Sequence, residues 1–317
     1  MDARAIRNAL VRWYESAKRD LPWRRTRDPY AIWISEIMLQ QTRVAAVIPY
    51  YERFLAAFPN ATELARAAED QVLTMWSGLG YYSRARNLQK AARQMGGTFP
   101  RDYESIRALA GVGEYTAAAV ASIAFGLPHA AVDGNVRRVI VRLMNDDAAD
   151  VARLAEKLLD RRDPGRWNQA LMELGATVCL PRDPLCGSCP IAFQCQAHRH
   201  GTQSELPSKR KKPEPLRLTR TLLMVRGKGR VLLTPSSRVQ GFWDLPEAEQ
   251  VTSCRPGALV GEFRHTITHR QYRFMVRRAK VTRFSKPLRW FADEQLDEIP
   301  LSTTAKKALR CLQEVDA

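Results

Sequence analysis

Residues 31–41 constrain the fold of this 317-residue chain more than any other segment, because they are almost entirely apolar. Asp28 and Pro29 precede them, and an Asp N-cap followed by proline in the first turn predicts a helix start. The apolar residues fall on every face rather than on one stripe, so the helix should be buried on most sides. One acid, Glu36, lies among them.

Glu36 is a candidate proton donor. Burial raises the pKa of a carboxyl group, and a general acid that works near neutral pH needs a raised pKa. The alternative is a structural glutamate at the edge of a cleft, paired with a nearby arginine such as Arg19 or Arg24.

The charge of the chain predicts a polyanionic partner. Lys and Arg number 50 against 33 Asp and Glu, which gives a net charge of +17 and a pI near 10.0. Nucleic acid fits better than a membrane, because no apolar run approaches the roughly eighteen residues of a membrane span. The N-terminus lacks the apolar core of a secretory signal. We therefore expect a cytoplasmic, nucleoid-associated monomer.

The periodicity of the sequence changes once along the chain. Residues 1–200 show helical periodicity and are predicted to be all-α, and a polar, proline-containing linker is predicted at 201–215. Residues 216–317 alternate in the manner of strands and are predicted to form an α+β domain. In it, residues 221–225 and 231–234 should form a hairpin, 272–276 a further strand, and 302–314 a final helix.

A glycine turn joins two predicted helices within residues 105–125. Gly111 and Gly113 allow a tight turn that brings backbone N–H groups at a helix start against an anion. With Thr116, Ala117 and an alanine-rich helix after it, the turn matches a helix-hairpin-helix, which binds the DNA backbone without reading sequence.

Two further segments carry candidate site residues. Tyr81 and Tyr82 follow a glycine turn and open a basic helix, which suits either insertion into a base stack or packing on the core. Asp133 lies where a helix should begin, so it is an N-cap candidate. Helix amides keep a carboxylate ionised, and an ionised acid near a protonated one is the pair that cleaves glycosidic bonds.

Four of the six cysteines crowd into one short loop. Cys179, Cys186, Cys189 and Cys195 are separated by six, two and five residues, and prolines stiffen the loop between them. Four thiolates can hold zinc or an iron–sulfur cluster. Because the spacing differs from the paired knuckles of structural zinc, it favours [4Fe–4S].

Together these segments resemble the MutY family of adenine DNA glycosylases over nearly the whole chain. The matching motifs are residues 35–42, 78–82, 109–117, 132–135 and 172–176 and the four cysteines. The resemblance implies a two-lobed, all-α helix-hairpin-helix glycosylase domain with a [4Fe–4S] loop, followed by an α+β Nudix-like domain. The implied activity is removal of adenine mispaired with 8-oxoguanine or guanine in double-stranded DNA.

The resemblance also implies a role for individual residues. Glu36 would protonate adenine N7, Asp133 would stabilise the oxocarbenium ion in a retaining reaction, and Tyr115 and Asn135 would position these groups. The implied adenine pocket consists of Arg19, Trp23, Arg24, Leu39 and Glu173. Gln41 and Tyr81 would wedge into the base stack while the adenine is flipped out.

Differences from related families make the expected activity more specific. Endonuclease III-like lyases carry Lys where this chain has Tyr115, so strong lyase activity is not expected. Residues 267–269 match the family's lesion-reading loop, with Thr268 and His269 as the candidate contacts to 8-oxoguanine. The glutamate cluster of the Nudix signature is missing, so no pyrophosphatase activity is expected. A thymine or uracil mismatch glycosylase and a catalytically silent damage-binding protein are the alternatives.

Overall fold

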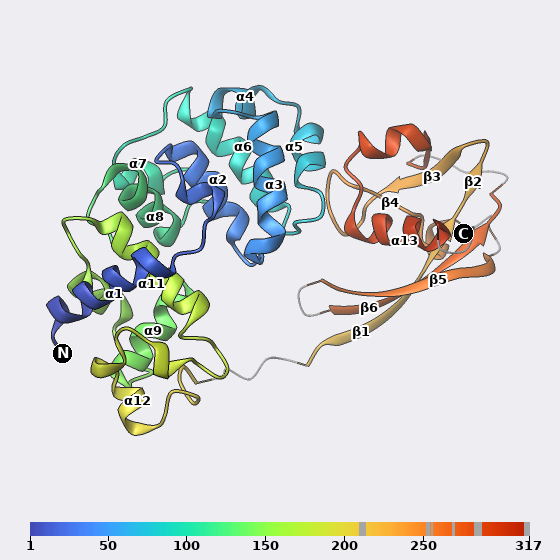
Figure 1. The fold of residues 1–317 in the computed structure, drawn as a ribbon. Coiled ribbons are helices and arrows are strands. Elements are labelled where there is room, and N and C mark those ends of the chain that lie inside the picture. Colours follow the sequence, from blue (N-terminus) through green and yellow to red (C-terminus); the bar gives the residue numbers. More distant parts are fainter. Residues whose placement is uncertain (209–213, 252–253, 255, 268–269, 282–286, 314–317) are drawn as a thin grey trace. The chain divides into compact units, whose positions relative to one another are not determined.

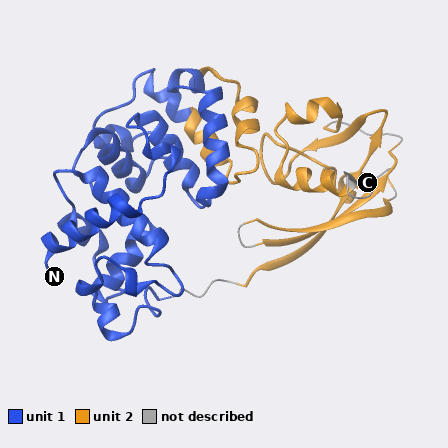
Figure 2. Ribbon diagram, in the orientation of Figure 1, with its two compact units in different colours: residues 1–65, 90–210 blue, residues 66–89, 211–317 orange. Residues whose placement is uncertain are grey.

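The computed structural model describes residues 1–208, 214–251, 254, 256–267, 270–281 and 287–313 (Figure 1). Their contacts form two compact units, one of residues 1–65 and 90–210 and the other of residues 66–89 and 211–317 (Figure 2). The domain boundaries expected from the sequence, 1–200 and 216–317 with a linker at 201–215, stay a prediction. Residues 66–89, however, group with the C-terminal part of the chain.

Every regular element described between residues 1 and 200 is a helix, as predicted. The α-helices are α1 (Ala3–Ala17), α2 (Pro29–Leu39), α3 (Val44–Ala57), α4 (Ala61–Arg66), α5 (Glu69–Trp76), α6 (Ser83–Met95), α7 (Tyr103–Arg107), α8 (Glu114–Phe125), α9 (Gly134–Met144), α10 (Val151–Leu158), α11 (Pro164–Thr177) and α12 (Gln196–His200). Short 3₁₀ helices lie at η1 (Pro22–Arg24), η2 (Cys186–Ser188) and η3 (Ala192–Gln194).

Helix α2 begins where the sequence predicts. The Asp28 carboxylate accepts hydrogen bonds from the N–H groups of Tyr30 and Ala31, at 3.1 and 3.3 Å. Every residue from Tyr30 to Met38 is buried, because α2 packs against both α3 and α8. The helix ends at Leu39, before the predicted residue 41, and Gln41 adopts a left-handed backbone with φ of 59°.

The predicted helix-hairpin-helix is formed by α7 and α8. Gly111 takes a φ of +75° in the turn, a value that L side chains rarely adopt, and Gly113 is the N-cap of α8. Helix α8 is buried through Ala117, Ala118 and Ala119, whose small side chains allow close packing on α2 and α11. The hairpin prediction is confirmed.

A second group of helices, α1, α9, α10 and α11, shares one hydrophobic core, which includes Leu10, Ile140, Trp167 and Leu171. Helix α11 belongs to this core and also packs against α8. Helix α11 therefore connects this group to the group that contains α2 and α8. A site between the two groups would be lined by the side of α11 that faces α8.

The C-terminal part is an α+β structure. Its strands are β1 (Leu216–Met224), β2 (Arg226–Gly227), β3 (Arg230–Pro235), β4 (Trp243–Asp244), β5 (Pro256–Ile267), β6 (Arg270–Ala279) and β7 (Arg289–Ala292). One sheet has the order β1-β6-β5, and in the other β3 pairs with β2, β4 and β7. The 3₁₀ helix η4 (Ala248–Gln250) lies between β4 and β5, η5 (Asp293–Asp297) follows β7, and α13 (Thr303–Gln313) packs on β5.

The predicted hairpin needs a correction. Its turn is present, but the arm paired with β3 consists of β2, through Arg226 and Gly227, and of Val225, whose O accepts the Leu232 N–H at 3.0 Å. Residues 221–224 instead belong to β1, which pairs in parallel with β6. Leu222, Leu223 and Met224 are all buried. The strand therefore needs apolar cover on both faces, which a two-stranded hairpin does not provide.

The expected strand at 272–276 is confirmed within β6, and the expected final helix is confirmed as α13 up to Gln313. In the parts of the chain that the structure describes, no helix is both long enough and apolar enough to cross a bilayer.

Candidate active site

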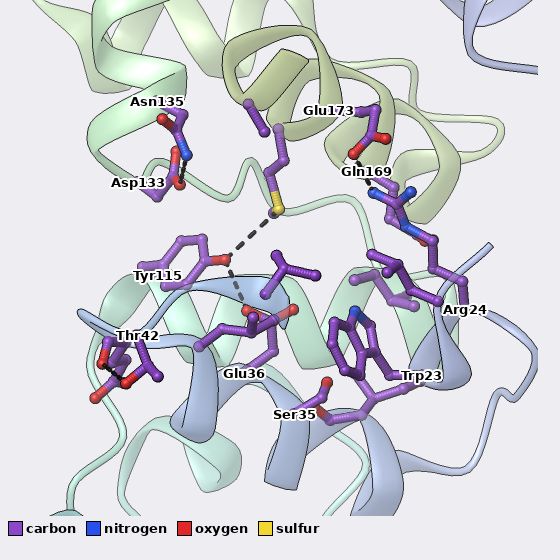
Figure 3. Close-up of a pocket in the computed structure, with 18 of the residues that line it drawn as sticks. Trp23, Arg24, Ser35, Glu36, Thr42, Tyr115, Asp133, Asn135, Gln169 and Glu173 are labelled. Carbon is purple, nitrogen blue, oxygen red and sulfur yellow. Dashed lines mark hydrogen bonds and ion pairs between the residues drawn. The ribbon is translucent and has the colours of Figure 1, made fainter. Parts of the chain in front are cut away.

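A cavity of about 640 Å³ lies in the helical unit between α2, α8 and α11. It brings together ten residues that the sequence singled out, although they lie far apart along the chain (Figure 3). They are Arg19, Trp23, Arg24, Glu36, Leu39, Gln41, Tyr115, Asp133, Asn135 and Glu173.

Glu36 lies on α2 and its side chain reaches the cavity although the residue is only 6% exposed. The Tyr115 hydroxyl donates a hydrogen bond to Glu36 Oε2 at 2.7 Å and lies 3.5 Å from Met172 Sδ. Burial raises the pKa of Glu36 to about 7; the Asp133 charge adds to the rise, while the Tyr115 hydrogen bond and Arg24 oppose it. Glu36 can therefore hold a proton near neutral pH.

Asp133 is the N-cap of α9, as predicted. Its Oδ1 accepts the Val136 N–H at 2.7 Å, and its Oδ2 accepts a hydrogen bond from Asn135 Nδ2 at 3.1 Å. These two hydrogen bonds fix both oxygens of the Asp133 carboxyl group. The cavity thus holds one buried carboxyl group with a raised pKa and a second that is fixed by one helix N–H group and the Asn135 side-chain amide.

Asn135 is itself fixed by Arg138, a buried residue of α9. The Arg138 guanidinium donates to Asn135 Oδ1 at 2.9 Å, to Gly175 O at 2.7 Å and to Cys179 O at 2.8 Å. One side chain therefore joins the Asn135–Asp133 pair, helix α11 and the first cysteine of the cysteine loop, which we define as residues 179–195.

Glu173 forms the opposite wall of the cavity and is fully buried. It accepts hydrogen bonds from the Arg19 guanidinium at 2.8 and 2.7 Å, from the Arg19 backbone N–H at 3.0 Å, and from Arg24 at 2.7 Å. Burial by itself would raise the pKa of Glu173, but these hydrogen bonds and charges outweigh it and lower the pKa to about 2. The alternative in which Glu36 pairs with Arg19 or Arg24 is wrong, because both guanidinium groups bind Glu173.

Figure 3 shows the arrangement of these groups: Asp133 and Asn135 lie on one side of Tyr115 and Glu36, and Arg24, Gln169 and Glu173 lie on the other. Trp23, 7% exposed, packs edge-on against Tyr51 with ring centroids 5.4 Å apart. Its ring gives the cavity a flat apolar wall. The site therefore combines a buried acid with a raised pKa, a second acid held at a helix N-terminus and an aromatic surface.

Among the cavity residues to which the sequence analysis assigned no role are Arg138, Gln169 and Met172. A signal for two of them was present, since residues 169, 172, 173 and 176 recur at helical spacing and all line the cavity. Arg138 had no comparable signal, because an arginine inside a helix most often lies on the solvated face.

Not every predicted residue lies in this cavity. Tyr81 belongs to the other compact unit, is 51% exposed and has a left-handed φ of 46°. Gly111 and Gly113 lie in the hairpin turn. Thr268 and His269, the predicted lesion contacts, lie outside the residues that the structure describes.

The four predicted cysteine ligands line a separate small cavity together with Arg142, and none forms a disulfide. Arg142 is 2% exposed; its guanidinium donates to Cys179 Sγ at 3.3 Å and to Leu180 O at 2.7 Å. Within the described ranges, no three Cys, His, Asp or Glu side chains already converge as a metal site. The donor set nevertheless fits a thiolate-bound group, because four sulfurs share one cavity beside a buried cation.

The fold and cavity define a class of base-excision protein. Residues 34–162 match the family model described as "HhH-GPD superfamily base excision DNA repair protein". Among solved structures, a thermostable thymine-DNA glycosylase is 31% identical with a TM-score of 0.59, over 62% of this chain and 97% of that one.

Curated relatives indicate a particular family within this class of base-excision proteins. The adenine DNA glycosylase of the rat is 46% identical over 65% of this chain and 44% of its own length. That of Buchnera aphidicola (Baizongia pistaciae) is 35% identical over 74% of this chain and 70% of its own length. The chain belongs to the adenine DNA glycosylase family. It spans less than half the length of the rat relative that it matches.

Proposed function

We propose that this protein is a monofunctional DNA glycosylase that excises adenine mispaired with 8-oxoguanine or guanine in double-stranded DNA. The observation that carries the proposal is the buried Glu36, with a pKa of about 7, in one cavity with Asp133. The adenine glycosylase relatives support the choice of base.

In the proposed reaction Glu36 donates its proton to adenine N7. Protonation makes the base a neutral leaving group, and the electrons of the N-glycosidic bond pass to it as the bond breaks. Tyr115 keeps its own proton, because burial raises its pKa well above the usual value. It therefore acts as a hydrogen-bond donor that orients the Glu36 carboxyl group.

Asp133 stabilises the positive charge that develops on the sugar. The Asp133 carboxylate on that face can also attach transiently to the sugar carbon, and water then displaces it with net retention. Asn135, held by Arg138, keeps the Asp133 carboxylate aimed at the sugar. No lysine stands in the position of Tyr115, so no amine is available there for the Schiff base of a lyase.

The opposite side of the cavity recognises the base. Trp23 offers a flat surface for stacking on a purine. The Gln169 side chain carries both a donor and an acceptor, as a purine edge requires, and its Oε1 accepts a hydrogen bond from Tyr14 at 3.2 Å. Arg19, Arg24, Leu39 and Glu173 complete this pocket in the proposal.

DNA contacts outside the cavity are also part of the proposal. The hairpin amides at Gly111 and Gly113 hold the backbone, and Gln41 and Tyr81 wedge into the stack. The C-terminal part serves as a Nudix-like reader of 8-oxoguanine through Thr268 and His269.

Cys179, Cys186, Cys189 and Cys195 would hold a [4Fe–4S] cluster, which would supply structural order to the loop rather than a chemical step. Purified protein should then be brown and contain about four irons per chain by analysis of iron and sulfide. A colourless protein loaded with zinc would overturn this assignment.

A panel of duplexes tests the function. Single-turnover formation of abasic sites is measured on A:8-oxoG, A:G, T:G and U:G pairs, for the natural protein and for Glu36→Gln. The proposal expects cleavage of the two adenine pairs only, and retained binding without base release by Glu36→Gln. The similarity to a thymine-DNA glycosylase favours the rival, which predicts cleavage of T:G or U:G. Absence of any abasic site would leave a damage-binding protein.

A further inference from the structure

A second cavity shares a wall with the cavity of the candidate active site. Its volume is about 760 Å³, and it is lined by the end of α1, residues 18–27, the end of α8 and the start of α11. We call it the seam cavity. Arg19, Arg24, Ile123 and Gln169 line both cavities, so the wall between them is one layer of side chains. Both volumes lie in the range of small-molecule sites.

The proposed function, on which this inference rests, creates a need for a second opening. An extruded nucleotide enters base first, so its sugar lies at Asp133 and its base extends toward the opposite wall. That wall contains Arg24, Gln169 and Glu173 (Figure 3). After the glycosidic bond breaks, the sugar and its DNA still block the entrance, and the free base faces the seam cavity.

The wall between the two cavities contains one side chain that can move, that of Arg19. Glu173 is fully buried, but the Arg19 side chain that covers it is 38% exposed. If the Arg19 guanidinium swings outward, Glu173 still accepts the Arg19 backbone N–H at 3.0 Å and Arg24 at 2.7 Å. The buried carboxylate therefore keeps two hydrogen bonds while the Arg19 guanidinium is away, which limits the cost of opening.

The lining of the seam cavity suits a free purine. Cations outnumber acids in it, and Arg162 and Arg166 lie with Thr26 beyond the shared wall. Guanidinium planes stack on flat bases, and a neutral base meets no charge repulsion there. We propose that the excised adenine leaves through the seam cavity while the abasic DNA is still bound.

The test follows base and DNA separately after one turnover. A duplex with radiolabelled adenine opposite 8-oxoguanine is cleaved by excess protein, and free adenine and free DNA are then measured over time in the presence of unlabelled competitor duplex. The natural protein should release adenine faster than it releases DNA. Release of adenine and DNA at one common rate would overturn the proposal.

Matched variants identify the route. Thr26→Trp fills the seam cavity and should slow adenine release by about tenfold, toward the rate of DNA release, without changing the rate of bond cleavage. Thr26→Ala removes the same hydroxyl but adds no bulk, so it should behave as the natural protein. Unchanged adenine release in Thr26→Trp would show that the base leaves by the front.

A second obstructing variant and the yield of adenine distinguish the possible outcomes. Arg162→Trp, at an exposed position of the same cavity, is a second obstruction in case Thr26→Trp does not fold, and bond cleavage reports folding for both. If no adenine is formed at all by the natural protein, the proposed function fails. If adenine is formed but leaves only with DNA, the exit route alone fails.

Discussion

At the residue scale, burial and one hydroxyl group act in opposite directions on the pKa of the proposed acid. The Tyr115 hydrogen bond stabilises the charged form of Glu36 and so lowers its pKa, while burial keeps the pKa near 7. The two residues lie 79 positions apart in sequence. The pH range in which the site works therefore depends on the packing of α2 against α8.

Tyr115→Phe tests this coupling. Removing the hydroxyl deletes the hydrogen bond that lowers the Glu36 pKa, so the pKa should rise above about 7. Since only protonated Glu36 acts, the alkaline fall in single-turnover rate should move to higher pH, with a lower maximum from poorer positioning. An alkaline fall that stays in place or moves to lower pH would contradict the proposed contact.

Glu173 should stabilise the fold through its buried pairing with Arg19 and Arg24. Glu173→Gln leaves Arg19 and Arg24 facing a buried neutral amide, which should destabilise the fold by about 3–5 kcal/mol. Asp20→Asn is the control, because the Asp20–Arg25 pair has side chains 73% and 65% exposed and should contribute little to stability. Urea unfolding measures both; equal effects would contradict the buried role.

The pH dependence of this contribution has a definite sign. The pKa of Glu173 is depressed from 4.5 to about 2 in the fold. Its stabilisation is therefore complete above 4.5 and is lost as the pH falls through about 2.

Much of the site was predictable residue by residue, but its ion pairs were not. Asp28 and Asp133 were identifiable as N-caps because capping depends on neighbours in sequence. Glu173 binds arginines 154 and 149 positions away, and no local pattern encodes such a contact. The sequence-based choice between Glu36 as an acid and Glu36 as an arginine partner therefore had to stay open.

At the element scale, helix α11 determines the shape of the site. Its residues Gln169, Met172 and Glu173 line the cavity, and two glycines bring it close to its neighbours. A Cβ on Gly165 would lie 2.6 Å from Ser122 O on α8, and one on Gly175 would lie 2.7 Å from Asn135 Cβ on α9. Either contact is too short for real atoms.

Gly175→Ala should therefore damage catalysis through geometry. The added methyl group must push Asn135 aside, which releases Asp133 from its hydrogen bond, and we expect a rate loss of about tenfold or more because misplaced catalytic groups lose rate steeply. Single-turnover kinetics measures it. Gly227→Ala, where a Cβ meets nothing within 4 Å, is the control. A Gly175→Ala protein with the natural rate would exclude this role of α11.

Most of the helices and strands could be predicted from the sequence, because helix caps and the spacing of apolar residues are local signals. The hairpin of α7 and α8 follows from its two glycines. The parallel pairing of β1 with β6 was not readable, since it joins segments about fifty residues apart and depends on which buried face each strand must cover.

At the scale of the whole molecule, charge should dominate affinity for DNA. With a net charge of +17, binding should weaken linearly on a plot of log affinity against log salt, because bound phosphates release their counterions. Titration of fluorescent duplex at several salt concentrations measures the slope. A slope near zero would contradict a backbone-binding role for the hairpin.

The grouping of residues 66–89 with the C-terminal part is also a property of the whole molecule. Ser77 Oγ donates to Leu301 O at 2.6 Å, and the hydroxyls of Tyr82 and Thr303 lie 3.1 Å apart. Such contacts join segments more than two hundred residues apart. The boundaries drawn from periodicity alone could not include them.

The most direct measurement is the single-turnover rate of adenine release from an A:8-oxoG duplex, recorded from about pH 5 to about pH 9. With Glu36 as the acid, the rate should fall about tenfold per pH unit above about 7, and Glu36→Gln should release no adenine at any pH. A rate that stays level across this range, or adenine release by Glu36→Gln at the natural rate, would contradict proton donation by Glu36.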